Sequence, residues 1–238
     1  PPANNGRIIE EPIPGGIVSP KGKLIYIIAL VIGIGIPISI IYLLNLLRFR
    51  IEGHTDVEKL TTVPIIGDIP LTDAGKNGTP TIAVRENDNN IMAETFRSLR
   101  TNLLFIMGDP DKKVILVTST ISGEGKTFMA SNLAVSLALL GKKVILVGLD
   151  IRKPGLNKIF HLSHKEKGIT QYLAAPQSTD LHALIQPSGI TSNLDLLLGG
   201  PIPPNPTELL ARQSLEDTIS TLRKEYDYIV LDTAPIGM

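Results

Sequence analysis

An uncharged run of 24 residues, residues 24–47, constrains the fold of this chain more than any other feature. The run, LIYIIALVIGIGIPISIIYLLNLL, contains sixteen leucine, isoleucine or valine residues. As an α-helix it would be about 36 Å long, which exceeds the roughly 30 Å hydrocarbon layer of a bilayer. Core helices of soluble proteins are seldom apolar on every face, and signal peptides have shorter apolar regions and a small-residue cleavage site. We therefore predict a single transmembrane helix over these residues.

The charges on the two sides of this helix are nearly balanced. Lys21 and Lys23 precede the run, and Arg48 and Arg50 follow it. Because the positive-inside rule needs an excess of basic residues on one side, these charges do not orient the helix in the membrane.

The remaining chain divides into three parts by composition. Residues 1–23 are rich in proline and glycine and predict an extended connector, and residues 48–80 predict a linker that follows the membrane helix. Residues 81–238 predict a soluble domain. Because the chain begins without methionine and stops abruptly, we expect a fragment with material missing at both ends, so that the soluble domain is truncated at its C-terminus.

Composition argues against several classes of function. The chain has 23 basic and 23 acidic residues and only 4% aromatic residues, so it offers neither a positive field nor many stacking platforms for bases. We expect no nucleic-acid partner. The absence of cysteine excludes disulfides and thiolate zinc sites, and the four histidines show no metal-ligand spacing.

Short apolar strands alternate with helices in the soluble domain. Apolar runs predict strands at residues 112–120, 142–150, 194–200 and 226–235, and apolar periodicity predicts helices at residues 90–106, 126–141 and 205–226. We expect Gly141 to cap the second of these helices, and Asn205 to begin the third. Strands that are apolar on both faces and separated by helices predict an α/β domain with a parallel sheet flanked by helices.

The octapeptide TISGEGKT, Thr120 to Thr127, follows the first of these strands and opens a helix. It matches the phosphate-binding P-loop pattern except that Thr120 stands where the pattern has its first glycine. Gly123 and Gly125 would let the backbone approach a phosphate, Lys126 would supply a cation, and Thr127 a hydroxyl for Mg²⁺. With the strand before it and the helix after it, this loop predicts a P-loop NTPase that binds ATP and Mg²⁺.

An acidic residue far along the chain completes the predicted nucleotide site. Asp232 follows directly after the apolar strand in YIVLDTAP. This is the position of a Walker B carboxylate, which holds the metal ion of a P-loop enzyme.

Four segments together resemble one family: TSTISGEGKT, VILVGLDIRKP, NPTELL and YIVLDTAP. They are similar to the bacterial tyrosine kinases (BY-kinases) of capsule and exopolysaccharide export, which are polysaccharide co-polymerases with a cytoplasmic ATPase fused behind a membrane span. The resemblance implies that residues 1–23 are the end of a periplasmic chain-length-determinant region. It also implies that residues 24–47 cross the bacterial inner membrane, and that the kinase domain after them is cytoplasmic.

The resemblance assigns roles to individual residues. It implies catalytic roles for Lys126, Asp150 and Asp232, and a Mg²⁺ site formed by Thr127, Asp150 and Asp232. The implied nucleotide contacts are Ser122, Gly123, Glu124, Gly125, Lys126, Thr127, Phe128 and Arg152. The family's further motif, D-x-D-x-R, reads Gly148-Leu149-Asp150-Ile151-Arg152 in this chain, so its first carboxylate is missing.

A second motif of the family, E-x-x-R-x-x-R, is matched by Glu94, Arg97 and Arg100. On a helix, Glu94 and Arg97 are neighbours and could simply form a solvated ion pair. The resemblance implies instead that this helix reaches the next subunit and assembles a ring.

The resemblance further implies a polysaccharide polymerase and export machinery and a tyrosine phosphatase as partners. The acceptor tyrosines of the family lie in a tail that this chain does not include.

Three functions follow from these patterns. The first is an ATP-dependent protein-tyrosine autokinase that regulates polysaccharide chain length and export. The second is a partitioning-type ATPase with a deviant Walker motif, but such proteins carry a lysine where this chain has Ile121. The third is a non-catalytic co-polymerase scaffold that only senses ATP, which the glycine at position 148 keeps open.

Overall fold

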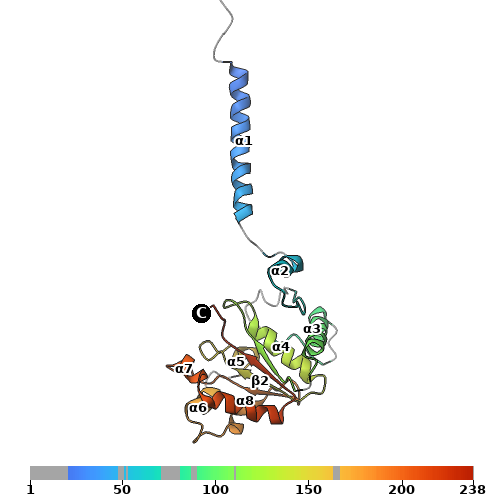
Figure 1. Cartoon of the computed structure of the whole chain (residues 1–238), viewed down its shortest axis with the longest axis vertical. Helices are drawn as coiled ribbons and strands as arrows, with labels where there is room; N and C mark the ends of the chain where they lie inside the picture. The colour runs from blue at the N-terminus through green and yellow to red at the C-terminus, as the bar shows by residue number, and fades with distance from the viewer. Residues whose placement is uncertain are drawn as a thin grey trace, which may run out of the picture. The chain divides into compact units, whose positions relative to one another are not determined.

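The computed structural model describes residues 21–47, 51, 53–70, 81–86, 90–109, 111–162 and 167–237. The chain forms two compact units, residues Pro1–Ile65 and Ile66–Met238. Figure 1 shows both units coloured along the chain. The connector predicted at the N-terminus lies almost entirely outside the described residues.

The first unit contains the predicted apolar helix. Helix α1 spans Gly22–Leu47, two residues longer than predicted at its start, and none of its residues is buried. The helix is long and apolar enough to cross a membrane, with a mean hydropathy of 2.8 over its most apolar window. An apolar helix without any burial is not the core helix of a soluble domain, so this exposure favours the membrane interpretation. A short helix, α2 (His54–Leu60), follows it.

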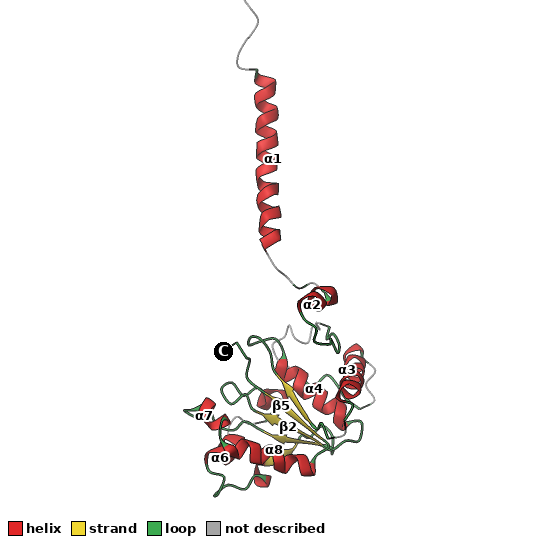
Figure 2. Ribbon diagram, in the orientation of Figure 1, coloured by secondary structure: helices red, strands yellow, loops and turns green. Residues whose placement is uncertain are grey.

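A five-stranded sheet with the order β1-β5-β2-β4-β3 forms the centre of the second unit (Figure 2). Strands β1 (Val114–Val117), β5 (Tyr228–Asp232), β2 (Val144–Gly148) and β4 (Leu194–Leu197) are parallel, which confirms the predicted fold class. The prediction missed β3 (Ile185–Pro187), an edge strand that pairs with β4 antiparallel. A strand of only three residues is too short for its apolar pattern to be recognised in the sequence.

Apolar residues cover both faces of the sheet. Val144 and Leu146 of β2 belong to one buried cluster, with helices α3 (Ile91–Met107) and α4 (Lys126–Ala138). Alternate residues of the same strand face a second cluster. That cluster includes residues of α6 (Ile169–Ala174), α7 (Pro206–Leu210), α8 (Gln213–Glu225) and η2 (His182–Leu184). This alternation explains why the strands are apolar throughout. The remaining helix, α5, spans Leu156–Ile159.

The segment predicted as one helix over residues 205–226 forms two. Arg212 lies between α7 and α8 with extended backbone, and its guanidinium donates hydrogen bonds to the carbonyls of Leu173 and Ala174 at the end of α6. These tertiary contacts outweigh the helical propensity of the segment. Asn205 precedes α7 as predicted, but its side chain donates to Glu208 rather than capping the helix.

The end of α4 also differs from the prediction. The helix stops at Ala138, and Gly141 lies beyond it in the left-handed region, with φ 82°. The Gly141 amide donates to the Ala138 carbonyl and closes the turn. Glycine is therefore required in the turn after the helix, as a residue that tolerates positive φ.

His182 links η2 to the end of α8 and gives a small pH dependence. Its Nε2 lies 2.8 Å from Glu225 Oε1, and this hydrogen bond, with the charges of Glu225 and Asp180, raises the pKa of His182. A raised pKa means that the stabilisation is complete below about pH 6.5 and is lost as the pH rises through the higher folded-state value. We expect His182→Gln to lower stability by about 0.5 kcal/mol at pH 5.5, since His182 is exposed and Glu225 only half-buried, and by less at pH 8.5. Thermal unfolding at the two pH values checks this, and a cost that grows with pH would contradict it.

Candidate active site

The loop between β1 and α4 needs glycine at two positions, and Thr120 is not one of them. Gly123 and Gly125 have φ values of 96° and 88°, which other residues rarely adopt. Among the residues that the structure describes, only His161 combines a side chain with positive φ. Thr120 therefore has a backbone conformation that any residue can adopt, and the missing first glycine is no defect of this loop.

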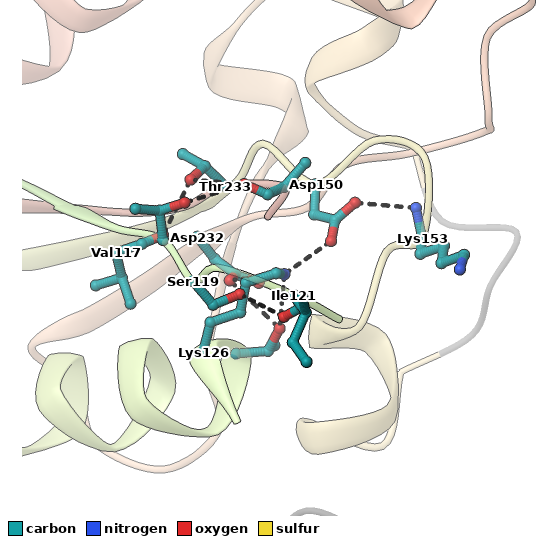
Figure 3. Close-up of polar contacts among 11 residues, drawn as sticks. Val117, Ser119, Ile121, Lys126, Asp150, Lys153, Asp232 and Thr233 are labelled. Atoms are coloured by element: carbon teal, nitrogen blue, oxygen red, sulfur yellow. Dashed lines mark hydrogen bonds and ion pairs between the residues drawn. The ribbon is translucent and has the colours of Figure 1, made fainter. Parts of the chain in front are cut away.

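The side chain of Lys126 lies between the two predicted acidic residues (Figure 3). Its Nζ is 2.7 Å from Asp150 Oδ2 and 3.4 Å from Asp232 Oδ1. The hydroxyl of Thr127 donates to Asp232 Oδ1 at 3.3 Å. Four residues that are up to 106 positions apart in the sequence thus meet at the carboxyl ends of the parallel strands, where α/β proteins bind their ligands.

Asp232 is the most deeply buried member of this cluster. Its side chain is 1% exposed, compared with 8% for Asp150 and 10% for Lys126. Burial raises the pKa of the Asp232 carboxyl, whereas the Lys126 charge and the hydrogen bond from Thr127 oppose that rise. The second carboxylate oxygen, Oδ2, has no hydrogen-bond partner within the described part of the chain. A buried carboxylate oxygen without a partner, beside a hydroxyl and a second carboxylate, fits the oxygen ligands and bound waters that Mg²⁺ prefers.

Backbone hydrogen bonds fix the two acidic residues to each other. The Asp232 carbonyl accepts the amides of Leu149 and Asp150, at 2.8 and 2.9 Å. The strand register pairs Gly148 with Asp232. The amide of Lys153 in turn donates to Asp150 Oδ1 at 3.0 Å and orients that carboxylate. The spacing of the two carboxylates is therefore set by strand pairing and one shared peptide group.

Gly148, where the resemblance expects an aspartate, is closely packed. A Cβ at this position would lie 3.1 Å from the Gly199 amide nitrogen and 3.1 Å from Leu156 Cδ1. Both contacts are tighter than an ordinary van der Waals contact. The neighbours of Gly148 thus leave little room for a side chain.

Three further residues predicted as nucleotide contacts have partners in the protein. Arg152 donates to the Thr207 hydroxyl at 2.8 Å. This hydrogen bond joins residues 150–152 to α7. The Phe128 ring packs edge-to-face against Phe96 of α3. Glu124 accepts hydrogen bonds from two amides of its own loop. Ser122 is exposed.

Comparisons with known proteins place this site in a family. A family model described as an AAA domain matches residues 112–237, more than half of the chain. The tyrosine-protein kinase YwqD of Bacillus subtilis is 38% identical over 62% of this chain and 60% of its own length. The kinase domain of the Escherichia coli tyrosine kinase ETK has a TM-score of 0.71 and 28% identity, over 79% of this chain and 74% of that structure. The BceF tyrosine kinase domain has a TM-score of 0.69 and 30% identity, over 79% and 78%.

The chain belongs to the bacterial tyrosine kinases. The names of these relatives favour the kinase interpretation over the partitioning ATPase and the non-catalytic scaffold. Membership of this P-loop family implies that the site binds a nucleotide. The chain spans about a third of the length of several curated relatives, among them the tyrosine-protein kinase etk of Escherichia coli, of which it covers 34%.

The E-x-x-R-x-x-R residues of this chain lie on α3, on two different surfaces. Glu94 and Arg97 form an ion pair on the exposed side of the helix. Arg100 instead donates to the Ser136 carbonyl of α4 at 2.6 Å, and burial together with the Arg97 charge lowers its pKa. Arg100 therefore anchors α3 to α4 within this chain, a role that the motif did not predict.

Sequence reasoning missed two residues that support the candidate site. Thr207, in the NPTELL segment, holds Arg152, and the Lys153 amide holds Asp150. The family resemblance flagged NPTELL as a motif, but only the folded chain shows its hydroxyl beside Arg152. A backbone amide carries no sequence signal, because every residue except proline has one.

Proposed function

We propose that this chain belongs to an enzyme that transfers the γ-phosphoryl group of ATP to tyrosine hydroxyl groups. The observation that carries the proposal is the cluster of Lys126, Thr127, Asp150 and Asp232, buried at the mouth of a glycine-containing loop. A cation, a hydroxyl and two carboxylates meet there beside the N-terminus of α4, which favours a bound anion. The relatives' names supply the chemical class of the acceptor.

The roles of the residues follow from their chemistry. The loop amides and Lys126 would bind the β and γ phosphates and offset their charge. Thr127, Asp150 and Asp232 would hold Mg²⁺, which supplies further charge neutralisation at the transferred group. Asp150 is more exposed than Asp232, so we assign to Asp150 the second task of accepting the proton of the acceptor hydroxyl.

Phosphotyrosine formation tests this proposal directly. The full-length protein that contains this chain, in detergent with MgATP and a tyrosine-rich acceptor peptide, should give a phosphotyrosine signal that depends on both Mg²⁺ and Lys126. A Lys126→Met variant serves as the control. If wild-type protein binds MgATP but yields no lysine-dependent phosphotyrosine, the kinase proposal fails and an ATP-sensing role takes its place.

Restoring the family's missing carboxylate is expected to harm the protein rather than help it. In Gly148→Asp, the new side chain must displace Leu156 or the Gly199 backbone, so we expect a loss of about 1 to 3 kcal/mol in the free energy of unfolding. We expect no gain in phosphoryl transfer. Denaturant unfolding and the phosphotyrosine assay measure the two effects. Faster transfer at unchanged stability would show that this position can supply a catalytic carboxylate.

The proposal extends to the membrane and to partners. The long apolar helix α1, whose residues 24–47 carry no charge, supports an inner-membrane location in a bacterium, with residues 1–23 periplasmic and the kinase domain cytoplasmic. We propose that the protein regulates polysaccharide chain length through the polymerase and export machinery, and that a tyrosine phosphatase reverses its modification. Exposure of the kinase domain to protease in spheroplasts and in inverted vesicles tests the orientation.

We also propose that the kinase domains assemble into a ring through α3. Glu94 lines a surface pocket together with Asp68, Thr95 and Ser98, beside the exposed Ile91. Because Arg100 anchors α3 internally, Arg97→Ala is a cleaner test than a change of both arginines. The variant should show a lower assembly mass in light scattering. An unchanged mass would leave the Glu94–Arg97 pair as a solvated surface contact.

A further inference from the structure

The Glu124 side chain folds back across the phosphate loop. Its Oε2 accepts the amide of Thr120 at 2.8 Å and the amide of Ile121 at 3.2 Å. One carboxylate oxygen thus closes a ring of five residues at the start of the loop. Bonds from amides to a carboxylate are among the stronger hydrogen bonds in proteins.

The opposite side of the same residues is held by other contacts. The Thr120 carbonyl accepts the Gly237 amide at 3.0 Å. The Ile121 carbonyl accepts the Ser119 hydroxyl at 2.9 Å (Figure 3). A Cβ at Gly237 would lie 2.5 Å from the Thr120 carbonyl oxygen, so this approach requires glycine. The amide and carbonyl groups of Thr120 and Ile121 therefore all have partners within the chain, which leaves the later loop residues to bind phosphate.

We propose that Glu124 is a positioning residue for the nucleotide site and not a nucleotide ligand. Its carboxylate holds the first two amides of the loop and thereby shapes the phosphate-binding backbone before the nucleotide arrives. This inference rests on the proposed function and refines it at the same site. It also explains why threonine is tolerated at position 120. Because the hydrogen bonds to Glu124 hold the backbone there, the conformational freedom of a glycine is not needed.

The alternative role for Glu124 is to contribute only negative charge near the bound phosphates. The two roles predict different effects of removing Glu124 on nucleotide binding. If Glu124 only contributed negative charge near the phosphates, its removal would strengthen nucleotide binding. If Glu124 braces the loop, its removal leaves two amides without their partner and a loop that must become ordered on binding. The two roles predict changes of opposite sign.

The test uses the full chain in detergent and a fluorescent MgADP analogue as the probe. We expect Glu124→Ala to raise the dissociation constant about tenfold, since both amides lose their charged acceptor. Glu124→Asp should behave like alanine, because its shorter side chain does not reach both amides. Glu124→Gln retains an acceptor oxygen and should recover part of the affinity. Glu86→Ala, an exposed carboxylate outside the loop, is the matched control.

Hydrogen exchange without nucleotide gives a second readout that is independent of binding. The amides of Thr120 and Ile121 should exchange faster in Glu124→Ala than in wild type, at an unchanged melting temperature. Equal or tighter MgADP binding by Glu124→Ala, or unchanged exchange of the two amides, overturns the positioning role. Failure of the wild type to bind MgADP would instead refute the proposed function, and the exchange measurement would still decide the role of Glu124.

Discussion

Replacing Lys126 by methionine is expected to lower phosphoryl transfer by at least about a hundredfold, because the lysine offsets charge on the transferred group. The same substitution should also destabilise the nucleotide-free protein. Lys126 is the cation between Asp150 and Asp232, at 2.7 and 3.4 Å, and all three side chains are nearly buried. Removing one partner of a buried ion pair leaves an uncompensated charge, which typically costs about 3 to 5 kcal/mol.

The pH dependence of the Lys126→Met variant has a defined sign. Burial already raises the pKa of Asp232 while Lys126 opposes the rise, so loss of the lysine raises that pKa further. A carboxyl with a raised folded-state pKa stabilises the fold when protonated, and this contribution is lost as the pH rises through that value. The defect of the variant should therefore shrink as the pH is lowered, in urea unfolding at several pH values.

A double variant separates the two effects of Lys126. Adding Asp232→Asn to Lys126→Met removes the buried charge and should restore most of the lost stability, whereas transfer should stay at the background level. If the double variant is as unstable as Lys126→Met, the carboxylate is not the source of the defect. If Lys126→Met retains wild-type transfer, the assigned phosphate contact is wrong.

Gly168→Ala is expected to destabilise the second unit by about 3 kcal/mol or more. A Cβ at this position would lie 2.3 Å from the Gly200 amide nitrogen and 2.4 Å from the Leu198 carbonyl oxygen. Both are backbone atoms, so the strain is not relieved by a side-chain rotation. The segment must also keep its hydrogen bond from the Ile169 amide to the Leu198 carbonyl, at 2.8 Å.

Thermal unfolding followed by circular dichroism measures this effect. Gly53→Ala is the matched control, since no atom lies within 4 Å of the Cβ that it would add. The control should melt like wild type. A Gly168→Ala protein that melts within a degree or two of the control would mean that the backbone at 198–200 moves aside at little cost.

The positions of Lys126, Thr127 and Asp232 could be predicted from the sequence because they follow from the general rules of parallel α/β sheets. A loop with glycines between a strand and a helix places Lys126 and Thr127 at the carboxyl end of the sheet. Asp232 ends another parallel strand, so it lies at the same edge. Asp150 came from the family resemblance, and the structure places its carboxylate beside the lysine.

The features that were not predicted depend on contacts between distant segments. The break between α7 and α8 follows from the hydrogen bonds of Arg212 to the end of α6. The helical periodicity of the local sequence does not indicate these contacts. The anchoring of Arg100 to α4 and the reach of Arg152 to Thr207 are of the same kind. Glu124 was predicted as a nucleotide contact, but its carboxylate bonds to the loop's own amides, which only the folded loop reveals.

The Asp232 carbonyl that joins Asp150 to Asp232 has a consequence for the substitutions that this chain can tolerate over evolution. Because the Asp232 carbonyl accepts both the Leu149 and Asp150 amides, neither acid can shift without the other. A substitution deep in β2 or β5 that moves the two strands relative to each other would change the distance between the two carboxylates from a position far from them. The interior of β2 and β5 should therefore tolerate substitution less well than exposed loops outside the site.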